Sequence, residues 1–287
     1  MKTIEEAIQA ASVCLKNVGL ENPRMESEFL VAAFLKIPRT HLLLRRQQPL
    51  TAERIRALQA WLSERQKRKP LAYVTGEQPF RDWILKVNDA VLVPRPETEL
   101  LVEQALRLLD RLESPAIAVD VGTGSGNIAL SLSVHPKVKR VFGLDVSLDA
   151  LAVARDNAKQ SRHGAPVEWI AGSLLMPLQK RRLVADIVVA NLPYVRSEDM
   201  TGLAPELHWE PRLALDGGPD GLRLIDPCIT QAEDILRPGG HLLLEIGSEQ
   251  SQAVTALLKR RGLWTDIQIF RDLAGLPRIA QACRNGI

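Results

Sequence analysis

A glycine-rich loop followed by an acidic residue offers the first recognisable chemistry in the sequence. Gly122, Gly124 and Gly126 follow the apolar run AIAVDV, and Asp145 ends the next apolar run, VFGLD. Glycines let a backbone approach a ligand closely, and an acid at the end of the second strand can accept hydrogen bonds from ribose hydroxyls. The dinucleotide fingerprint G-x-G-x-x-G would require glycine at position 127, where the chain has asparagine.

The loop carries no Lys or Arg, although a phosphate-binding loop would need a lysine after its last glycine. The sulfonium of S-adenosylmethionine is cationic, so a loop without basic residues suits that ligand. We therefore expect S-adenosylmethionine as the cofactor. The residues expected to bind it are Gly122, Thr123, Gly124, Ser125, Gly126, Asp145 and Asn191. The alternative is a tight turn followed by an aspartate that caps a helix.

A second candidate site is the segment Asn191-Leu192-Pro193-Tyr194, which ends the apolar run ADIVVA. A primary amide or exocyclic amine has two N–H donors, and two fixed acceptors could orient it: the Asn191 side-chain oxygen and the Leu192 main-chain carbonyl. Pro193 would stiffen the turn, and Tyr194 would offer a ring on which a planar group can stack. These four residues are the predicted catalytic residues. An ordinary N-x-P turn is the alternative.

Methyl transfer to such a nitrogen mainly requires alignment of the acceptor with the sulfonium methyl. The attacking nitrogen can lose its proton after it has gained the methyl group, so the reaction needs no strong general base. The absence of a general base among the predicted site residues is therefore compatible with methyl transfer.

The elements that must position these residues form an alternating pattern in residues 96–287. Helices are expected near 97–112, 222–236 and 249–261, with shorter ones after the glycine loop and after Ser147. Strands are expected at 116–121, 141–146, 167–171, 185–191, 241–247, 264–270 and 278–283. Apolar strands that alternate with helices predict an α/β fold with a doubly wound, mostly parallel seven-stranded sheet covered on both faces.

The first 70 residues predict a small helical bundle. Thr3 and Glu6 form a capping box, Asn22 before Pro23 indicates a second helix start, and Thr51 a third. Residues 71–95 read as a linker that contains a hairpin with its turn at Asn88-Asp89. The expected organisation is thus a helical substrate-recognition domain (1–70), a hairpin linker (71–95) and a cofactor-binding domain (96–287).

Composition excludes several protein classes. The chain has 287 residues, 46% of them hydrophobic, which suits a globular protein. It has no apolar stretch long enough to span a membrane, and its N-terminus is too acidic for a signal peptide, so we expect a cytoplasmic protein. Three scattered cysteines indicate neither disulfides nor a metal site. The basic run Arg65–Lys69 is interpreted as a solvated helix end, with contact to RNA or an acidic partner as the alternative.

Over nearly its whole length the sequence resembles the protein-(glutamine-N5) methyltransferases that modify class-I peptide chain release factors. The segments that carry the resemblance are PLAYVTGEQPF (70–80), VLVPRPETELLVE (91–103), VDVGTGSGNIAL (119–130), ANLPYV (190–195), EPRLALDGGPDGL (210–222) and LRPGGHLLLEIG (236–247). The resemblance implies a Rossmann-like class I methyltransferase behind a helical N-terminal domain that grips the release factor.

The same resemblance implies methyl transfer from S-adenosylmethionine to the side-chain amide of the glutamine in a Gly-Gly-Gln motif. Residues 191–194 would hold this glutamine, and Leu174 would lie beside the adenine. Membrane association and a direct nucleic-acid substrate are not expected. The chain departs from the family pattern at Leu192, where proline is usual, and at Ser173, where an acidic residue is usual.

Three other functions stay open. N-L-P-Y also resembles the motif of RNA and DNA adenine-N6 methyltransferases, although RNA adenine enzymes usually carry their extra helical domain after the catalytic one. A sister enzyme that methylates glutamine of a ribosomal protein is closer, but PRPETE favours the release-factor branch. A non-catalytic cofactor-binding module is the third, and the presence of Asn191 argues against it.

Overall fold

The structure of the protein is a computed structural model that describes residues 2–160 and 163–286. The chain forms two units, which we call the helical unit and the sheet unit. The helical unit comprises Met1–Glu77 and Ala204–Trp209, and the sheet unit comprises Gln78–Leu203 and Glu210–Ile287. The three-part functional division expected from the sequence stays a prediction.

The described residues of the helical unit form five α-helices, α1 (Ile4–Asn17), α2 (Pro23–Leu35), α3 (Arg39–Arg45), α4 (Ala52–Gln66) and α5 (Leu71–Thr75), and the 3-10 helix Pro205–Trp209. The Thr3 capping box is confirmed, because the Glu6 N–H donates to the Thr3 hydroxyl and the Thr3 N–H donates to the Glu6 carboxylate. Thr51 caps α4 as expected, but Asn22 makes no side-chain capping bond at the start of α2. The sequence did not predict α3 or the two-residue strands β1 (Lys2–Thr3) and β2 (Pro49–Leu50).

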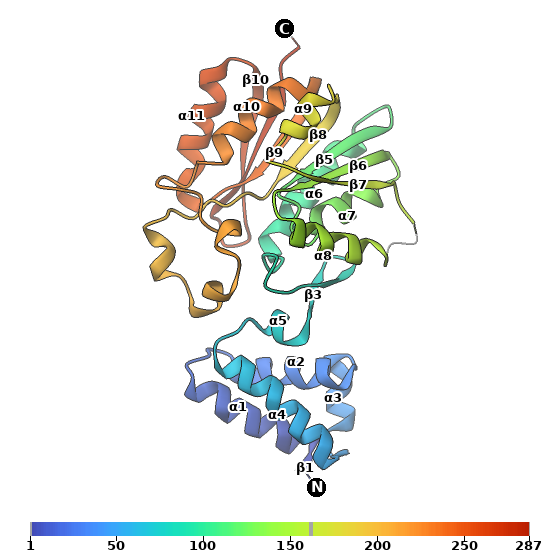
Figure 1. Cartoon of the computed structure of the whole chain (residues 1–287), viewed down its shortest axis with the longest axis vertical. Helices are drawn as coiled ribbons and strands as arrows, with labels where there is room; N and C mark the ends of the chain where they lie inside the picture. Colours follow the sequence, from blue (N-terminus) through green and yellow to red (C-terminus); the bar gives the residue numbers. More distant parts are fainter. Residues whose placement is uncertain (1, 161–162, 287) are drawn as a thin grey trace. The chain divides into compact units, whose positions relative to one another are not determined.

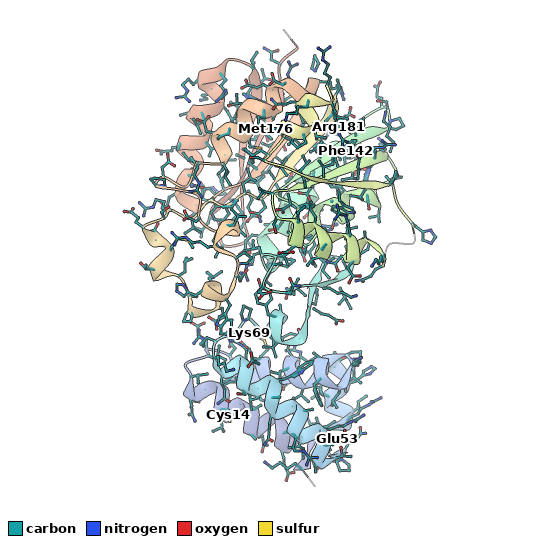
Figure 2. All side chains as sticks on the ribbon, in the orientation of Figure 1. Cys14, Glu53, Lys69, Phe142, Met176 and Arg181 are labelled. Carbon is teal, nitrogen blue, oxygen red and sulfur yellow. The ribbon has the colours of Figure 1, made fainter. Side chains whose placement is uncertain are left out.

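A buried ion-pair cluster joins residues of the helical unit that lie far apart in the sequence. Arg65 is only 3% exposed, and it donates to Glu26 at 2.6 Å and to Glu206 at 3.0 Å. Arg68 also donates to Glu206, at 2.7 and 2.8 Å. Lys69, labelled in Figure 2, has its ammonium 5.7 Å from the centre of the Trp209 ring. The basic run expected to be a solvated helix end is therefore paired within the protein at both arginines.

The hairpin lies earlier in the linker than the sequence indicated. Its strands are β3 (Glu77–Phe80) and β4 (Trp83–Lys86), so the turn is at Arg81-Asp82. Arg81 adopts a positive φ of 49°, and its N–H donates to the Glu99 carboxylate at 2.9 Å, which holds this turn. Asn88 instead accepts from the Ala90 N–H at 3.0 Å, which turns the chain without a second hairpin strand.

The sheet unit contains, among the described residues, a seven-stranded sheet of order β10-β11-β9-β8-β5-β6-β7. Its strands are β5 (Ala116–Val121), β6 (Val138–Asp145), β7 (Val167–Ala171), β8 (Ala185–Ala190), β9 (Leu236–Glu245), β10 (Trp264–Arg271) and β11 (Pro277–Arg284). Strands β5 to β9 pair in parallel, and β11 pairs antiparallel with both β9 and β10. The predicted mostly parallel α/β sheet is confirmed.

Helices cover both faces of this sheet (Figure 1). Those of the sheet unit are α6 (Pro96–Asp110), α7 (Asn127–Ser133), α8 (Leu148–Ala158), α9 (Met176–Lys180), α10 (Ile225–Ile235) and α11 (Ser251–Arg261). Alternate residues of β5 point to opposite faces: Val119 packs with residues of α10 and α11, whereas Ala118 packs with residues of α6 and α7. The fold is therefore doubly wound. The three longer helices expected from the sequence correspond to α6, α10 and α11, and the expected bounds differ from the observed ones by at most a few residues.

Within the described ranges, every helix is too short or too polar to cross a membrane.

Candidate active site

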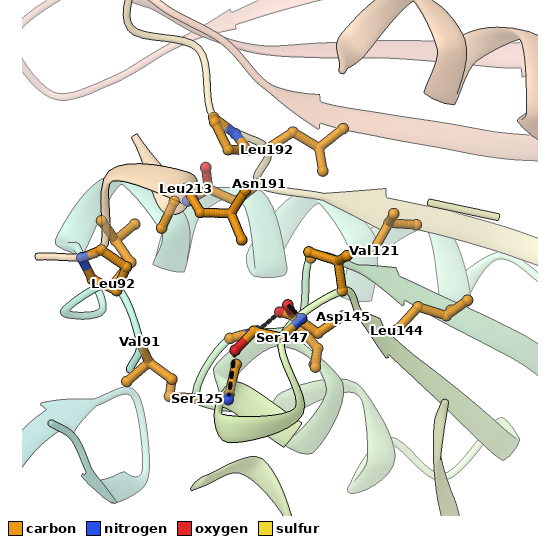
Figure 3. A pocket seen from close by; sticks show the side chains of 18 of the residues that line it. Val91, Leu92, Val121, Ser125, Leu144, Asp145, Ser147, Asn191, Leu192 and Leu213 are labelled. Atoms are coloured by element: carbon orange, nitrogen blue, oxygen red, sulfur yellow. Dashed lines mark hydrogen bonds between the residues drawn. The ribbon is translucent and has the colours of Figure 1, made fainter. Parts of the chain in front are cut away.

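The site lies where three neighbouring parallel strands end. The sheet order places β8, β5 and β6 side by side, so the residues that follow them meet at one edge of the sheet. There they line a cavity of about 280 Å³, near the lower end of the range for small-molecule sites. In Figure 3, Asn191, Leu192 and Leu213 lie at one end of the cavity and Ser125 and Ser147 at the other.

Most of the predicted site residues line this cavity: Gly122, Thr123, Gly124, Ser125, Asp145, Leu174, Asn191, Leu192 and Pro193. Gly126 and Tyr194 do not. Gly126 starts α7 with a φ of +83°, and a Cβ there would approach the Trp169 ring to 3.0 Å. Glycine is thus required at position 126 by helix packing, whereas at Gly124, with a φ of +52°, a Cβ would come no closer than 4.0 Å to its nearest neighbour, the Gly122 carbonyl oxygen.

Asp145 lies at the end of the cavity that the glycine loop forms. Its carboxylate accepts from the main-chain N–H of Gly124 and of Ser147, each at 2.9 Å. Burial raises the pKa of Asp145 above its usual range, while these main-chain donors act in the opposite direction. Each carboxylate oxygen has a second lone pair, so the group can still accept from a ligand hydroxyl.

Asp120 supports the glycine loop from beneath, a role that the sequence reading missed. This fully buried side chain accepts from the Thr123 hydroxyl at 2.5 Å and from the Ala129 N–H at 3.0 Å. Burial is the largest cause that raises the pKa of Asp120 to about 7. The carboxyl group ties the loop to the first turn of α7 and so fixes the path of the backbone along the cavity.

Asn191 stands at the opposite end with its amide held from one side. Its Nδ2 donates to the Thr98 hydroxyl at 3.0 Å. In the part of the chain that the structure describes, no group donates to its Oδ1. Asn191 lines the cavity, and its Oδ1 keeps its capacity to accept hydrogen bonds.

Tyr194 lies behind the cavity wall instead of in it. Its hydroxyl donates to Glu245 at 3.3 Å, and burial raises its pKa, so the phenol is neutral. The predicted stacking of a planar substrate on this ring finds no support in the position of Tyr194, because other residues form the wall.

Glu245 joins Tyr194 to Thr98 and was not identified from the sequence. The Thr98 hydroxyl donates to its second oxygen at 2.7 Å, and both residues are almost fully buried. Burial is the main reason that the pKa of Glu245 rises to about 7. Glu245 ends the apolar run HLLLE just as Asp145 ends VFGLD, and that shared position was the available signal.

A second buried acid lies beside the cavity. Glu210 accepts from the Val93 N–H at 2.9 Å and from the Arg95 guanidinium. Burial raises the pKa of Glu210, which the Arg95 charge opposes. Arg95 is the sole cationic side chain among the described lining residues, and its guanidinium already forms an ion pair with Glu210. Segments 91–103 and 210–222, singled out in the sequence, therefore meet beside the cavity.

The donor set of the cavity fits S-adenosylmethionine. A carboxylate suited to ribose lies at one end, apolar side chains form most of the wall, and Arg95 has a carboxylate partner instead of being available to a phosphate. The described residues contain no cluster of three or more His, Cys, Asp or Glu side chains that could hold a metal ion.

Comparisons with known proteins agree with this arrangement. The family model described as "PrmC N-terminal domain" matches residues 6–76, and that described as "Methyltransferase domain" matches residues 118–209. A methyltransferase structure from Pyrococcus furiosus is similar with a TM-score of 0.52 over 72% of this chain and 91% of that chain. At 16% identity, this likeness shows the fold alone.

Two curated relatives are similar over almost their full length. A release factor glutamine methyltransferase of Moorella thermoacetica is 42% identical, over 98% of this chain and 99% of the relative. One from Geobacter sulfurreducens is 37% identical, over 96% of this chain and 95% of the relative. The protein described here therefore belongs to the family of release factor glutamine methyltransferases.

Proposed function

We propose that this protein transfers the methyl group of S-adenosylmethionine to the side-chain amide nitrogen, N5, of the glutamine in the Gly-Gly-Gln motif of class-I peptide chain release factors. The observation that carries the proposal is the amide of Asn191, a residue of the cavity lining: its Nδ2 is held by Thr98, while none of the described residues donates to its Oδ1. A primary amide substrate needs such an acceptor. Family membership supports the choice of a glutamine in a release factor.

Cofactor binding is assigned to the end of the cavity that holds Asp145. The main chain of Gly122–Ser125 would lie along the cofactor, the Asp145 carboxylate would accept from its ribose, and Leu174 would lie beside the adenine. Gly126 contributes through the packing of α7 and not through contact with the cofactor. Ser173, which departs from the family pattern, also lines the cavity.

The chemistry depends on alignment. When bound, S-adenosylmethionine supplies a methyl group on a positively charged sulfur that is already activated for displacement. Asn191 Oδ1 would accept one N–H of the substrate amide, and the Leu192 main-chain carbonyl would accept the other. Holding an acceptor in line in this way can lower a barrier by about 7 kcal/mol or more. Pro193 restricts the turn that carries both acceptors, and the apolar wall keeps water from the reacting nitrogen.

The helical unit is proposed to bind the release factor at a surface away from the reacting glutamine, and the protein to act in the cytoplasm. The match of residues 6–76 to the N-terminal domain model supports the first assignment. A direct nucleic-acid substrate is not part of the proposal.

The test is methylation with labelled S-adenosylmethionine of a purified release factor, either wild type or with Gln→Ala in its Gly-Gly-Gln motif. We expect label on the wild type and none on the variant. Label on both would contradict the assignment of the acceptor. Label on naked RNA, or on a ribosomal protein in place of the release factor, would identify one of the two alternative methyltransferase functions.

A further inference from the structure

The orientation of the Asn191 amide decides whether the site can hold a substrate amide at all. An asparagine side chain presents an oxygen at one end and an NH2 group at the other, and rotation by half a turn exchanges them. With the NH2 group toward the cavity, Asn191 would offer donors to a substrate that itself brings donors. Something in the protein must therefore select one orientation.

Thr98 makes this selection through a single hydrogen. Its hydroxyl has one hydrogen to donate, and that hydrogen lies on the bond to Glu245 Oε2, at 2.7 Å. An ionised carboxylate only accepts, so the Thr98 oxygen is left with lone pairs toward Asn191. Only the NH2 group of Asn191 can then face Thr98, at 3.0 Å.

Burial keeps this chain of bonds from rearranging through solvent. Thr98 is 1% exposed and Glu245 is 2% exposed. The other oxygen of Glu245 accepts from the Tyr194 hydroxyl, so the Asn191–Tyr194 segment is tied to the same carboxylate at both of its ends. A polar group left unpaired at this depth would lose its hydrogen bond without gaining one from water, which maintains the pairing.

We propose that Thr98 and Glu245 are positioning residues that hold Asn191 with its amide oxygen toward the substrate glutamine. The inference rests on the proposed function and deepens it, because it names the residues that set the polarity of the acceptor site. Neither residue is assigned a contact with the substrate.

The arrangement makes turnover depend on the ionisation of Glu245. A protonated Glu245 can donate to the Thr98 oxygen, which frees the Thr98 hydrogen for Asn191 and permits the reversed amide. The titratable and charged groups that act on Glu245 are Tyr194, Arg278 and Glu97; Arg278 favours the ionised form and Glu97 opposes it. Burial outweighs them and places the pKa of Glu245 at about 7. Turnover should therefore rise with pH through this value.

The first experiment compares Thr98→Val with Thr98→Ser in methylation of the release factor. Valine keeps the shape but removes the hydroxyl, so we expect kcat to fall by on the order of tenfold to a hundredfold, with the Kd for S-adenosylmethionine changed by less than about threefold. Serine restores the hydroxyl and should recover most of the loss. Thr230→Val, on the exposed side of α10, is the matched control and should turn over like wild type.

Thermal unfolding of each variant separates a local effect from a folding defect. The proposal is overturned if Thr98→Val turns over within about threefold of wild type, if it loses cofactor binding in parallel with kcat, or if Thr98→Ser is as slow as Thr98→Val.

The second experiment needs no release factor, and so it distinguishes failure of this inference from failure of the proposed function. The side-chain NH2 signal of Asn191 in a 15N NMR spectrum is assigned by its loss in Asn191→Ala, and is then followed from pH 5.5 to 8.5. We expect it to shift with a midpoint near the pKa of Glu245, and to be insensitive to pH in Glu245→Gln. A signal that titrates equally in both proteins would show that Glu245 does not control Asn191.

Discussion

The two ends of the cavity are built in different ways. At the cofactor end, Asp145 is held by the main-chain N–H groups of Ser147, two residues later, and of Gly124, in the loop that follows the neighbouring strand β5. At the acceptor end, Asn191 is held by the side chain of Thr98, 93 residues earlier, and Thr98 in turn by Glu245, 147 residues later.

This difference determines how each end should respond to substitution. Main-chain donors remain when neighbouring side chains change, so the cofactor end depends on a few glycines and one acid. The acceptor end depends on the identity of several buried side chains, each of which fixes the next. Cofactor binding and turnover should therefore be separable by mutation.

The largest effect is expected for Asn191→Ala. Removal of the open Oδ1 should lower kcat by on the order of 10²- to 10³-fold, because the substrate amide loses a fixed acceptor. Cofactor affinity, measured by calorimetry, should change little. Equal loss of both would mean that the two ends are not independent and that Asn191 serves the fold or the cofactor.

Asp145→Asn should produce the opposite pattern. The amide retains one acceptor but loses the charge, so S-adenosylmethionine should bind about 10- to 100-fold more weakly. At saturating cofactor, kcat should stay within about threefold of wild type. A large drop in kcat with unchanged Kd would contradict the assignment of Asp145 to the cofactor end.

A pair of glycine variants tests the two parts of the loop. Alanine at either position meets the left-handed backbone, which is unfavourable by about 1–2 kcal/mol. At Gly126 the new Cβ also lies 3.0 Å from Trp169 and 3.3 Å from Ala154, so Gly126→Ala should lower the melting temperature more than Gly124→Ala does. Gly124→Ala should weaken cofactor binding more. The reverse order in either measurement would exchange the roles of the two glycines.

Glu245→Gln should show a smaller effect, on the pH dependence of stability. The pKa of Glu245 is about 7 in the folded protein and 4.5 without burial, so the folded state holds a proton that the unfolded chain has lost between these values. The free energy of unfolding of wild type should fall as pH rises through this window, by up to about 1.4 kcal/mol per pH unit. Glutamine removes this dependence.

Urea unfolding of both proteins at pH 5, 6, 7 and 8 measures the difference. Relative to wild type, the free energy of unfolding of the glutamine variant should increase with pH up to about pH 7, and above that pH the difference should stay constant. The pKa of Asp120 is also raised, but Asp120 is present in both proteins, so its contribution cancels in the difference between them. If the free energies of unfolding of the two proteins changed in parallel over the whole pH range, the pKa of Glu245 would not be raised in the folded protein.

The sequence predicted what local patterns can encode. Asp145 and Asn191 follow apolar runs, and parallel strands bring such residues to one edge, so their meeting could be deduced without coordinates. Thr98 could not be placed in this way, because its role depends on the packing of α6 against β8 and β9. Tyr194 was expected in the cavity because its ring could stack on a planar substrate, but the direction of a ring within a turn cannot be derived from residue type, and Tyr194 is not among the lining residues.

The hairpin shows the same limit on a smaller scale. Asn88-Asp89 is the stronger turn signal by residue type, yet the strands meet at Arg81-Asp82 because Glu99, on α6, captures the Arg81 N–H. A contact from elsewhere in the fold thus outweighed the local preference.

The helical unit contains residues 204–209, which lie far along the chain from the rest of the unit. A fragment that ended at Glu77 would keep Glu26 beside the guanidinium of Arg65 but would lack the second carboxylate, from Glu206. The helical unit is thus encoded in two separate stretches of the sequence. An exchange of the helical unit between two such proteins would therefore require both stretches to be moved together.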